Sequence, residues 1–366
     1  MFTGSTMKKF VFILVIVMIA SFAIAGMIFV GEYGENGFAA LDDKIRPANA
    51  IDVDEEKTEP LVGIKSIKVK TSSDDITFIP TDSNEVKARF HGYYSANAKD
   101  YRPEFTTTLT GEELTIKVEY PTFIGNISGN LKLDVYLPKA YSDSLQINTS
   151  SANVTIDELN VAGFICKTTS GDVNARLVNS DKAELGTASG KTRIAGKYGS
   201  FSFNSTSGDF NSDGITAGNA VLKTTSGKIQ LNVTADDLQL HSTSGDLIAD
   251  QVNAKNIKLD TASGKTFLRG IPGNVDATST SGDMNLEYTK YDNNIKIGTA
   301  SGKTAIKLPQ DSQFALEYKT ASGTGKCDFP LTVTGSQVRN NLEGTVVSSR
   351  NKITVNSASG DLNITK

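Results

Sequence analysis

The stretch Lys167-Thr168-Thr169-Ser170-Gly171-Asp172 returns in related form throughout the second half of the chain. Each copy has a hydroxyl residue, a variable residue, Ser and Gly, and most copies end in Asp or Lys. The glycines of successive copies stand 18 to 21 residues apart, at Gly171, Gly190, Gly208, Gly227, Gly245, Gly264, Gly282, Gly302 and Gly323, and a last copy has Gly360. A fixed period of this length predicts a solenoid built from repeated coils.

Apolar residues alternate on both sides of each glycine. Leu238 and Leu240 stand seven and five positions before Gly245, while Ile229 and Leu231 stand two and four positions after Gly227. A period of two is the spacing of a β-strand with one buried face. We therefore expect two short strands per coil, coils stacked about 4.8 Å apart through parallel pairing, and a corner at each glycine, which lacks a Cβ and accepts positive φ.

Two further positions recur at every corner. Three positions before the glycine a Ser or Thr is always present, and we expect these hydroxyls to hydrogen-bond from one coil to the next. The position after the glycine alternates between acid and base, in the order Asp172, Lys191, Asp209, Lys228, Asp246, Lys265, Asp283 and Lys303. Stacking would place these opposite charges about 5 Å apart. The sequence thus predicts an exposed charge ladder that fixes the register of the coils.

The N-terminal region has the features of an export signal. Residues 1–9 include Lys8 and Lys9, residues 10–30 are apolar enough to span a bilayer, and residues 31–60 read as an acidic linker. The positive-inside rule then places residues 1–9 in the cytoplasm and the body outside the cell. A cleaved signal ending at Ala25 is the alternative, and either Met1 or Met7 could be the start.

The body divides into two predicted regions. Residues 61–144 contain longer alternating runs and read as an irregular N-terminal β cap, in which Asp74 takes the glycine position of a coil. Residues 145–366 form the predicted solenoid domain, beginning with a coil that has Ala152 in the glycine position. The fold class is therefore an all-β, single-stranded β-solenoid (β-helix) of coils about 18–19 residues long, preceded by one transmembrane helix.

Motifs for catalysis, metals or cofactors are weak in this chain. Copies such as 189–192 imitate the end of a phosphate-binding loop, but they lack its spacing and the helix that should follow. His91 and His241 are the two histidines, and there is no nucleophile elbow for a triad. The aspartates of the charge ladder alternate with lysines, which disfavours calcium. We predict no catalytic residues, no metal and no cofactor, and the net charge of −4 with no basic stripe argues against nucleic acid.

The two cysteines occupy inward positions of distant coils. Cys166 precedes Gly171 and Cys327 follows Gly323, eight coil steps apart if coils stack in chain order. That separation is about 38 Å at the strand spacing, far beyond the reach of a disulfide. We expect two buried free thiols.

A resemblance to a known family rests on three features in this order: the N-terminal apolar segment, the Val-Tyr-Leu-Pro-Lys phrase at 135–139 and the tandem Ser-Gly coils. Together they resemble the putative-adhesin β-strand-repeat family, which includes the LiaG-like proteins of Gram-positive cell-envelope stress operons. The resemblance implies a non-catalytic, extracytoplasmic protein of the cell envelope, without defined binding residues.

The functional hypothesis is a membrane-anchored, non-enzymatic interaction protein. Its expected partners are the membrane, through the N-terminal segment, and a cell-wall polymer, a surface glycan or an envelope protein. One alternative is a polysaccharide-active β-helix enzyme, although the short turns leave no obvious cleft outside residues 79–144. The other is a self-assembling scaffold, since a solenoid end exposes unpaired strands.

Overall fold

The structure, a computed structural model, describes residues 46–96, 101–122, 127–333 and 340–366. All the helix and strand elements in these ranges are β-strands, as expected for an all-β chain. None of the described residues forms a helix that could cross a membrane. The predicted cytoplasmic N-terminus (1–9), the anchor (10–30) and the first half of the linker lie outside the described residues.

The chain separates into two compact units. The described part of the first unit comprises residues 46–52, 93–96 and 127–129. Within it, the Ser95 hydroxyl donates to the Asn49 side-chain oxygen at 2.8 Å. The guanidinium group of Arg46 lies 5.1 Å from the centroid of the Tyr93 ring. The second unit holds nearly all of the remaining described chain and contains the repeats.

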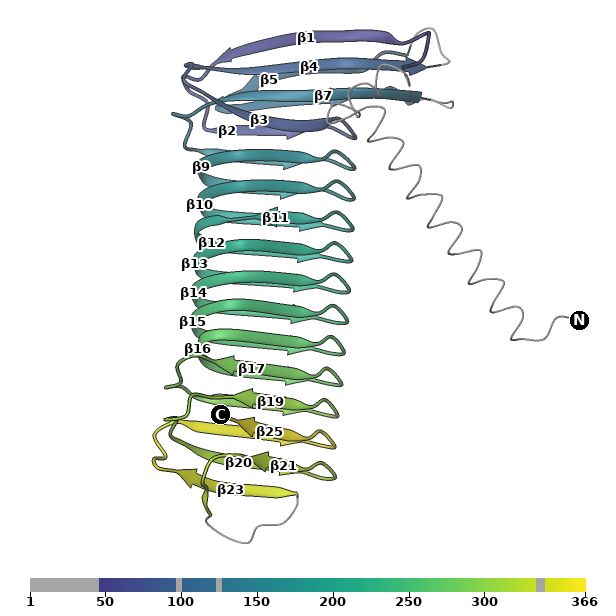
Figure 1. Cartoon of the computed structure of the whole chain (residues 1–366). Coiled ribbons are helices and arrows are strands. Elements are labelled where there is room, and N and C mark those ends of the chain that lie inside the picture. Colours follow the sequence, from purple (N-terminus) through teal and green to yellow (C-terminus); the bar gives the residue numbers. More distant parts are fainter. Residues whose placement is uncertain (1–45, 97–100, 123–126, 334–339) are drawn as a thin grey trace, which may run out of the picture. The chain divides into compact units, whose positions relative to one another are not determined.

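Within the second unit the coils stack as the repeat predicts (Figure 1). Each coil leaves a tight turn at the glycine, follows one strand segment, rounds a wider bend and returns along a second segment. Neighbouring coils pair in parallel, as in the alignment of Leu238 with Ile257. The strands of the regular coils are β8 (Ser144–Asn148), β9 (Val154–Lys167), β10 (Val173–Thr187), β11 (Thr192–Ile194), β12 (Gly196–Ser205), β13 (Phe210–Thr224), β14 (Ile229–Ser242), β15 (Leu247–Thr261), β16 (Thr266–Ser279) and β17 (Met284–Tyr288).

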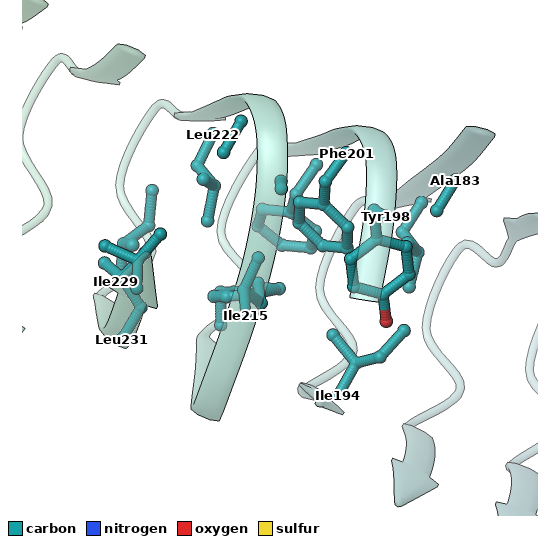
Figure 2. Packing of buried hydrophobic residues seen from close by; sticks show 14 of the residues in the cluster. Ala183, Ile194, Tyr198, Phe201, Ile215, Leu222, Ile229 and Leu231 are labelled. Atoms are coloured by element: carbon teal, nitrogen blue, oxygen red, sulfur yellow. The ribbon is translucent and has the colours of Figure 1, made fainter. Parts of the chain in front are cut away.

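The core is a narrow column of side chains between the two strand layers. Figure 2 shows apolar side chains from successive coils, among them Phe201 and Leu222, gathered within this column. Phe203 and Phe210 are at most 1 % exposed, and their ring centroids are 4.6 Å apart. Full burial of such a side chain contributes about 1.5–3 kcal/mol, so the inward rows supply most of the cohesion between coils.

At the N-terminal end of this unit the coils do not stack in chain order. β2 (Ser66–Lys70) pairs in parallel with β8 on one side and with β6 (Glu113–Glu119) on the other. Likewise β3 (Asp75–Thr81) lies between β9 and β7 (Ile127–Pro138). The coil register therefore begins at residue 66, inside the region predicted as an irregular cap. Antiparallel β5 (Glu104–Thr110) then covers β6.

The last part of the predicted acidic linker is a strand. β1 (Ile51–Pro60) pairs with β4 (Glu85–Ala96), which also pairs with β7. Two acids of β1 form ion pairs with bases of the second unit. Asp54 contacts Arg89 at 2.7 Å, and Glu55 contacts Arg102 at 2.8 Å. The acidic composition thus reflects a charged edge strand rather than a linker over residues 51–60.

The C-terminal end repeats the exchange of coil order. The final coil, β24 (Lys352–Ser357) and β25 (Leu362–Thr365), inserts between the coil of β18 (Ile295–Thr299) and β19 (Thr304–Lys307) and the coil of β20 (Phe314–Thr320) and β21 (Gly325–Cys327). Beyond β20, antiparallel β23 (Asn341–Val346) and β22 (Thr332–Val333) close that layer. The predicted stacking of the regular coils in chain order is therefore wrong at the C-terminal end.

Candidate functional site

The corner glycines align in one column along the tight-turn edge, as predicted, but their physical reason differs. A Cβ added at Gly227 would overlap the carbonyl oxygen of Gly208 in the preceding coil. The same overlap recurs down the column, where Gly360 follows Gly302 and Gly323 follows Gly360. None of the corner glycines has a positive φ. Glycine is needed because the backbones approach closely, and the predicted left-handed conformation is wrong.

The charge ladder also lies on this edge, but its contacts are not ion pairs. The Asp209 carboxylate accepts a hydrogen bond from the backbone N–H of Lys228 at 2.9 Å. The same contact joins Asp172 to Lys191, Asp246 to Lys265 and Asp283 to Lys303. No ion pair in the described part of the chain joins a ladder acid to a ladder lysine. Carboxylate-to-backbone hydrogen bonds therefore join successive coils, and the expected Coulombic contribution of the ladder stays a prediction.

The recurrent hydroxyls act within their own turn. Thr187 Oγ1 accepts from the Gly190 N–H at 2.9 Å, and Ser242 Oγ donates to the Gly245 carbonyl at 2.6 Å. The predicted hydroxyl-to-hydroxyl ladder between coils is absent at these positions. Most of these hydroxyls instead bond to a backbone group of their own turn, as Ser and Thr side chains favour. Thr168 and Thr320 also donate to a carbonyl of the neighbouring coil, and the buried Thr261 hydroxyl has no hydrogen-bond partner among the described residues.

The structure holds a second polar ladder that the sequence reading missed. On the bend edge, Asn256 donates to Asp237 at 3.0 Å, Asn274 donates to Asn256 at 3.3 Å, and Asn274 accepts from the Asn294 N–H at 3.1 Å. In the sequence, the recurrence of Asn at intervals of 18 to 20 residues is the feature that could have predicted this ladder. These side-chain hydrogen bonds join the bends of successive coils, in the same way that the ladder carboxylates join the tight turns.

Groups that could support catalysis remain apart. No cluster of three metal-binding side chains occurs among the described residues. His91 Nε2 lies 2.9 Å from Asp134 Oδ2. Asp74 is buried in its glycine position and is hydrogen-bonded by Thr71 and Tyr120; its burial raises the pKa of its carboxyl.

The cysteines are free, as predicted. Burial raises the pKa of the Cys166 thiol to about 12, so it remains a small apolar core residue. Cys327 is only half-buried, because it lies in the last coil, so the prediction that both are buried is wrong. The inserted coil increases their separation from eight steps to nine.

An open groove runs along the bend edge, opposite the glycine column. Its volume is about 940 Å³, and it crosses the coils of β9 to β16. One wall is a row of aligned side chains: Asn160, Asn179, Lys197, Thr216, Thr234, Asn253 and Ile271. The expectation that the solenoid lacks a cleft is therefore wrong. We call this concavity the bend groove.

Small residues make the bend groove hollow. Its floor includes Ala217, Ala235 and Ala254, which are aligned and buried. On the far wall, Gly199, Gly218 and Gly273 leave the groove without side chains in three coils. The aligned alanines at intervals of 18 to 19 residues were visible in the sequence but cannot be distinguished there from ordinary core positions.

Two matches of one family profile cover the repeats. The profile is described as Toastrack DUF4097, and it matches residues 64–232 and 195–365. The chain belongs to the Toastrack DUF4097 family. This membership confirms the resemblance to a putative-adhesin repeat family. The two matches together cover residues 64–365 and do not include β1.

The chain also matches solved structures from several bacteria. A putative lipid binding protein from Parabacteroides distasonis ATCC 8503 is 17% identical with a TM-score of 0.44, covering 72% of the Toastrack chain and 98% of its own. A putative cell adhesion protein from Clostridium sporogenes ATCC 15579 is 12% identical with a TM-score of 0.21, covering 86% and 99%. A putative adhesin from Bacteroides fragilis NCTC 9343 is 11% identical with a TM-score of 0.29, covering 87% and 98%. No curated protein matches the chain significantly.

Proposed function

We propose that this Toastrack protein is a non-enzymatic interaction protein of the cell envelope, held at the membrane by residues 10–30 with its solenoid outside the cell. The bend groove is the observation that carries the proposal. It gives the second unit a continuous recognition surface across seven coils, and solenoids characteristically bind partners along such extended surfaces.

The chemistry of the described residues favours binding over catalysis. A glycan-cleaving enzyme places a pair of carboxyl groups across the scissile bond. The two acids that line the bend groove, Asp181 and Asp236, stand on the same wall in coils three steps apart, about 14 Å along the axis at 4.8 Å per step. Asp236 is also neutralised by Lys255 at 2.6 Å. That arrangement supports recognition rather than bond cleavage.

Binding to isolated envelopes tests the proposal. The full-length chain, purified in mild detergent, should sediment with envelopes from the cells that produce it and should release no reducing sugar from them. Thr234→Trp, which fills the bend groove from an exposed position, should weaken this sedimentation. Thr225→Trp places the same side chain on the exposed tight turn and serves as the control.

Failure of the wild-type chain to bind envelopes, or steady release of sugar, would contradict the proposed function. Equal loss of binding in both tryptophan variants would argue that recognition does not use the bend groove. The anchor is tested separately by the mass of the N-terminal peptide from the membrane fraction, which should retain the Ala25–Gly26 bond.

A further inference from the structure

We infer that the bend groove binds a neutral polysaccharide chain lying along the solenoid axis, with about one sugar ring per coil. This inference rests on the proposed envelope function and assigns it a ligand class and a position. The argument combines the spacing of the groove wall, its free hydrogen-bonding groups and its charge.

The spacing of the wall suits a polymer. Its seven aligned residues from Asn160 to Ile271 span six coil steps, about 29 Å at 4.8 Å per step. A volume of 940 Å³ spread over that length leaves a long, shallow channel rather than a compact pocket. Extended pyranose chains repeat at nearly the spacing of stacked strands, so each ring would meet the same wall position in successive coils.

The central wall residues have hydrogen-bonding capacity to spare. Thr216, Thr234 and Asn253 are exposed and aligned in three consecutive coils. Within the described residues, their side chains make no hydrogen bond to the protein, whereas Asn160 and Asn179 bond to each other at 2.8 Å. Hydroxyl and amide groups both donate and accept, which matches the hydroxyl and acetamido groups of sugars.

The charge of the lining selects against an anionic polymer. The groove is lined by two acids, Asp181 and Asp236, and two bases, Lys197 and Lys255, so their formal charges cancel. One of each is already joined in the Lys255–Asp236 ion pair. A phosphate-rich polymer would require an excess of Lys or Arg. An uncharged glycan has no such requirement.

A length series of neutral oligosaccharides tests the inference. The probes are N-acetylglucosamine oligomers of two to eight rings and β-glucan oligomers of the same lengths, with polyglycerol phosphate as the anionic comparison. Calorimetry on the full-length chain in detergent should show affinity rising with neutral chain length and levelling off near seven rings, the number of coils in the groove wall. Polyglycerol phosphate should bind at least tenfold more weakly.

Two double Thr→Val variants test where the glycan contacts the protein. Thr216→Val with Thr234→Val removes both free hydroxyls while keeping the shape and the strand preference of the side chains, and should weaken binding about tenfold. Thr206→Val with Thr225→Val makes the same change at two exposed positions of the tight turns and should leave affinity unchanged.

The outcomes separate this inference from the proposed function. Unchanged neutral-glycan affinity in the groove pair, or preference for polyglycerol phosphate, would overturn the inference while leaving an envelope-binding protein. Absence of binding to every neutral oligomer, with envelopes still bound, would also overturn it. Absence of binding to envelopes themselves would contradict the proposed function.

Discussion

At the scale of single residues, the tight turn depends on how closely successive backbones approach. The carbonyl of each corner glycine occupies the space where the next glycine would carry a Cβ. The requirement therefore repeats with every coil, although no corner glycine has a positive φ. Sequence periodicity revealed the position of the glycines, but their close contact became visible only with the stacked coils.

Gly227→Ala should lower the free energy of unfolding by about 2 kcal/mol, the scale of an overpacked core position. The new methyl group would meet the Gly208 carbonyl, and the backbone has to move to accept it. Gly298→Ala is the matched control, because nothing lies within 4 Å of its added Cβ and its φ is not positive. That control should gain about 0.5 kcal/mol, as glycine in a strand interior is unfavourable. Denaturant titration measures both, and equal losses would contradict the close-approach explanation.

Asp209 distinguishes a hydrogen bond from an ion pair in the ladder. Asp209→Asn keeps a side-chain oxygen for the Lys228 N–H and should change the free energy of unfolding by less than about 0.5 kcal/mol. Asp209→Ala removes the acceptor and should cost about 1 kcal/mol, with little dependence on salt. If Asn and Ala are equally destabilising and high salt reduces both losses, the charge itself holds the register. Thermal melts of both variants at two ionic strengths distinguish the hydrogen bond from the ion pair.

Two aspartates predict opposite pH effects. Burial raises the pKa of Asp74, so its ionisation opposes folding, and wild-type stability should fall as pH rises above about 4. Asp74→Asn should therefore be more stable than wild type at neutral pH, with the advantage shrinking in acid.

Backbone and hydroxyl donation from Thr324 lowers the pKa of Asp361. The Asp361 carboxylate therefore stabilises the fold above its usual pKa, and this stabilisation is lost as pH falls. Asp361→Asn should be less stable than wild type at neutral pH. Unfolding is followed from pH 3 to 8, and the explanation is contradicted if both variants are more stable, or both less stable, than wild type at neutral pH.

At the scale of the elements, the coils alternate in length. Coils that begin after a ladder Asp are 19 residues long between Asp172 and Lys265, and those that begin after a ladder Lys are 18. The extra residue lies at the start of the bend, where the registers of β13 and β15 shift against their neighbours. Arg269 bridges to Asp250 of such a bulge at 2.5 Å, and its hydrogen bond lowers the pKa of that carboxyl. The repeating unit is thus a pair of coils.

Gln251 is the bulge residue with strained backbone, at a φ of 53°. Gln251→Gly should raise the free energy of unfolding by about 0.5 kcal/mol, because relief of the left-handed conformation exceeds the entropy that glycine loses. Gln251→Val should lower it by about 1–2 kcal/mol, since a β-branched side chain tolerates this conformation worst. Thermal unfolding compares the two, and a stabilising valine would show that the bulge is not strained.

The regular coils could be predicted because every position of the repeat faces the same environment. The coil order at the C-terminal end could not, since the phrase at 357–361 is compatible with any neighbour. In the structure Asp361 follows Lys303 and continues the alternation, and its carboxylate accepts from the Thr324 N–H at 2.9 Å. The bend groove was missed because its free threonines resemble ordinary exposed strand residues.

At the scale of the repeat unit as a whole, an antiparallel strand covers one strand layer at each end of the stack. β5 covers β6 at one end, and β23 covers β20 at the other. Open parallel edges would offer backbone groups to a second copy, whereas covered and charged edges discourage such pairing. Covering β6 and β20 removes two edges that a second copy could pair with, which disfavours the self-assembling scaffold.

Thr345→Pro tests whether the C-terminal closure prevents association. Thr345 lies in β23 between Ala315 of β20 and Thr332 of β22, so proline removes a ladder donor and cannot be accommodated in a paired strand. Light scattering of the full-length chain, corrected for detergent, should give a monomer for wild type and concentration-dependent association for Thr345→Pro. Thr345→Val retains the N–H and should remain monomeric. A polymeric wild type would restore the scaffold hypothesis, while a monomeric proline variant would show that β23 is not the barrier, because exposing the β20 edge would then create no template for a second copy.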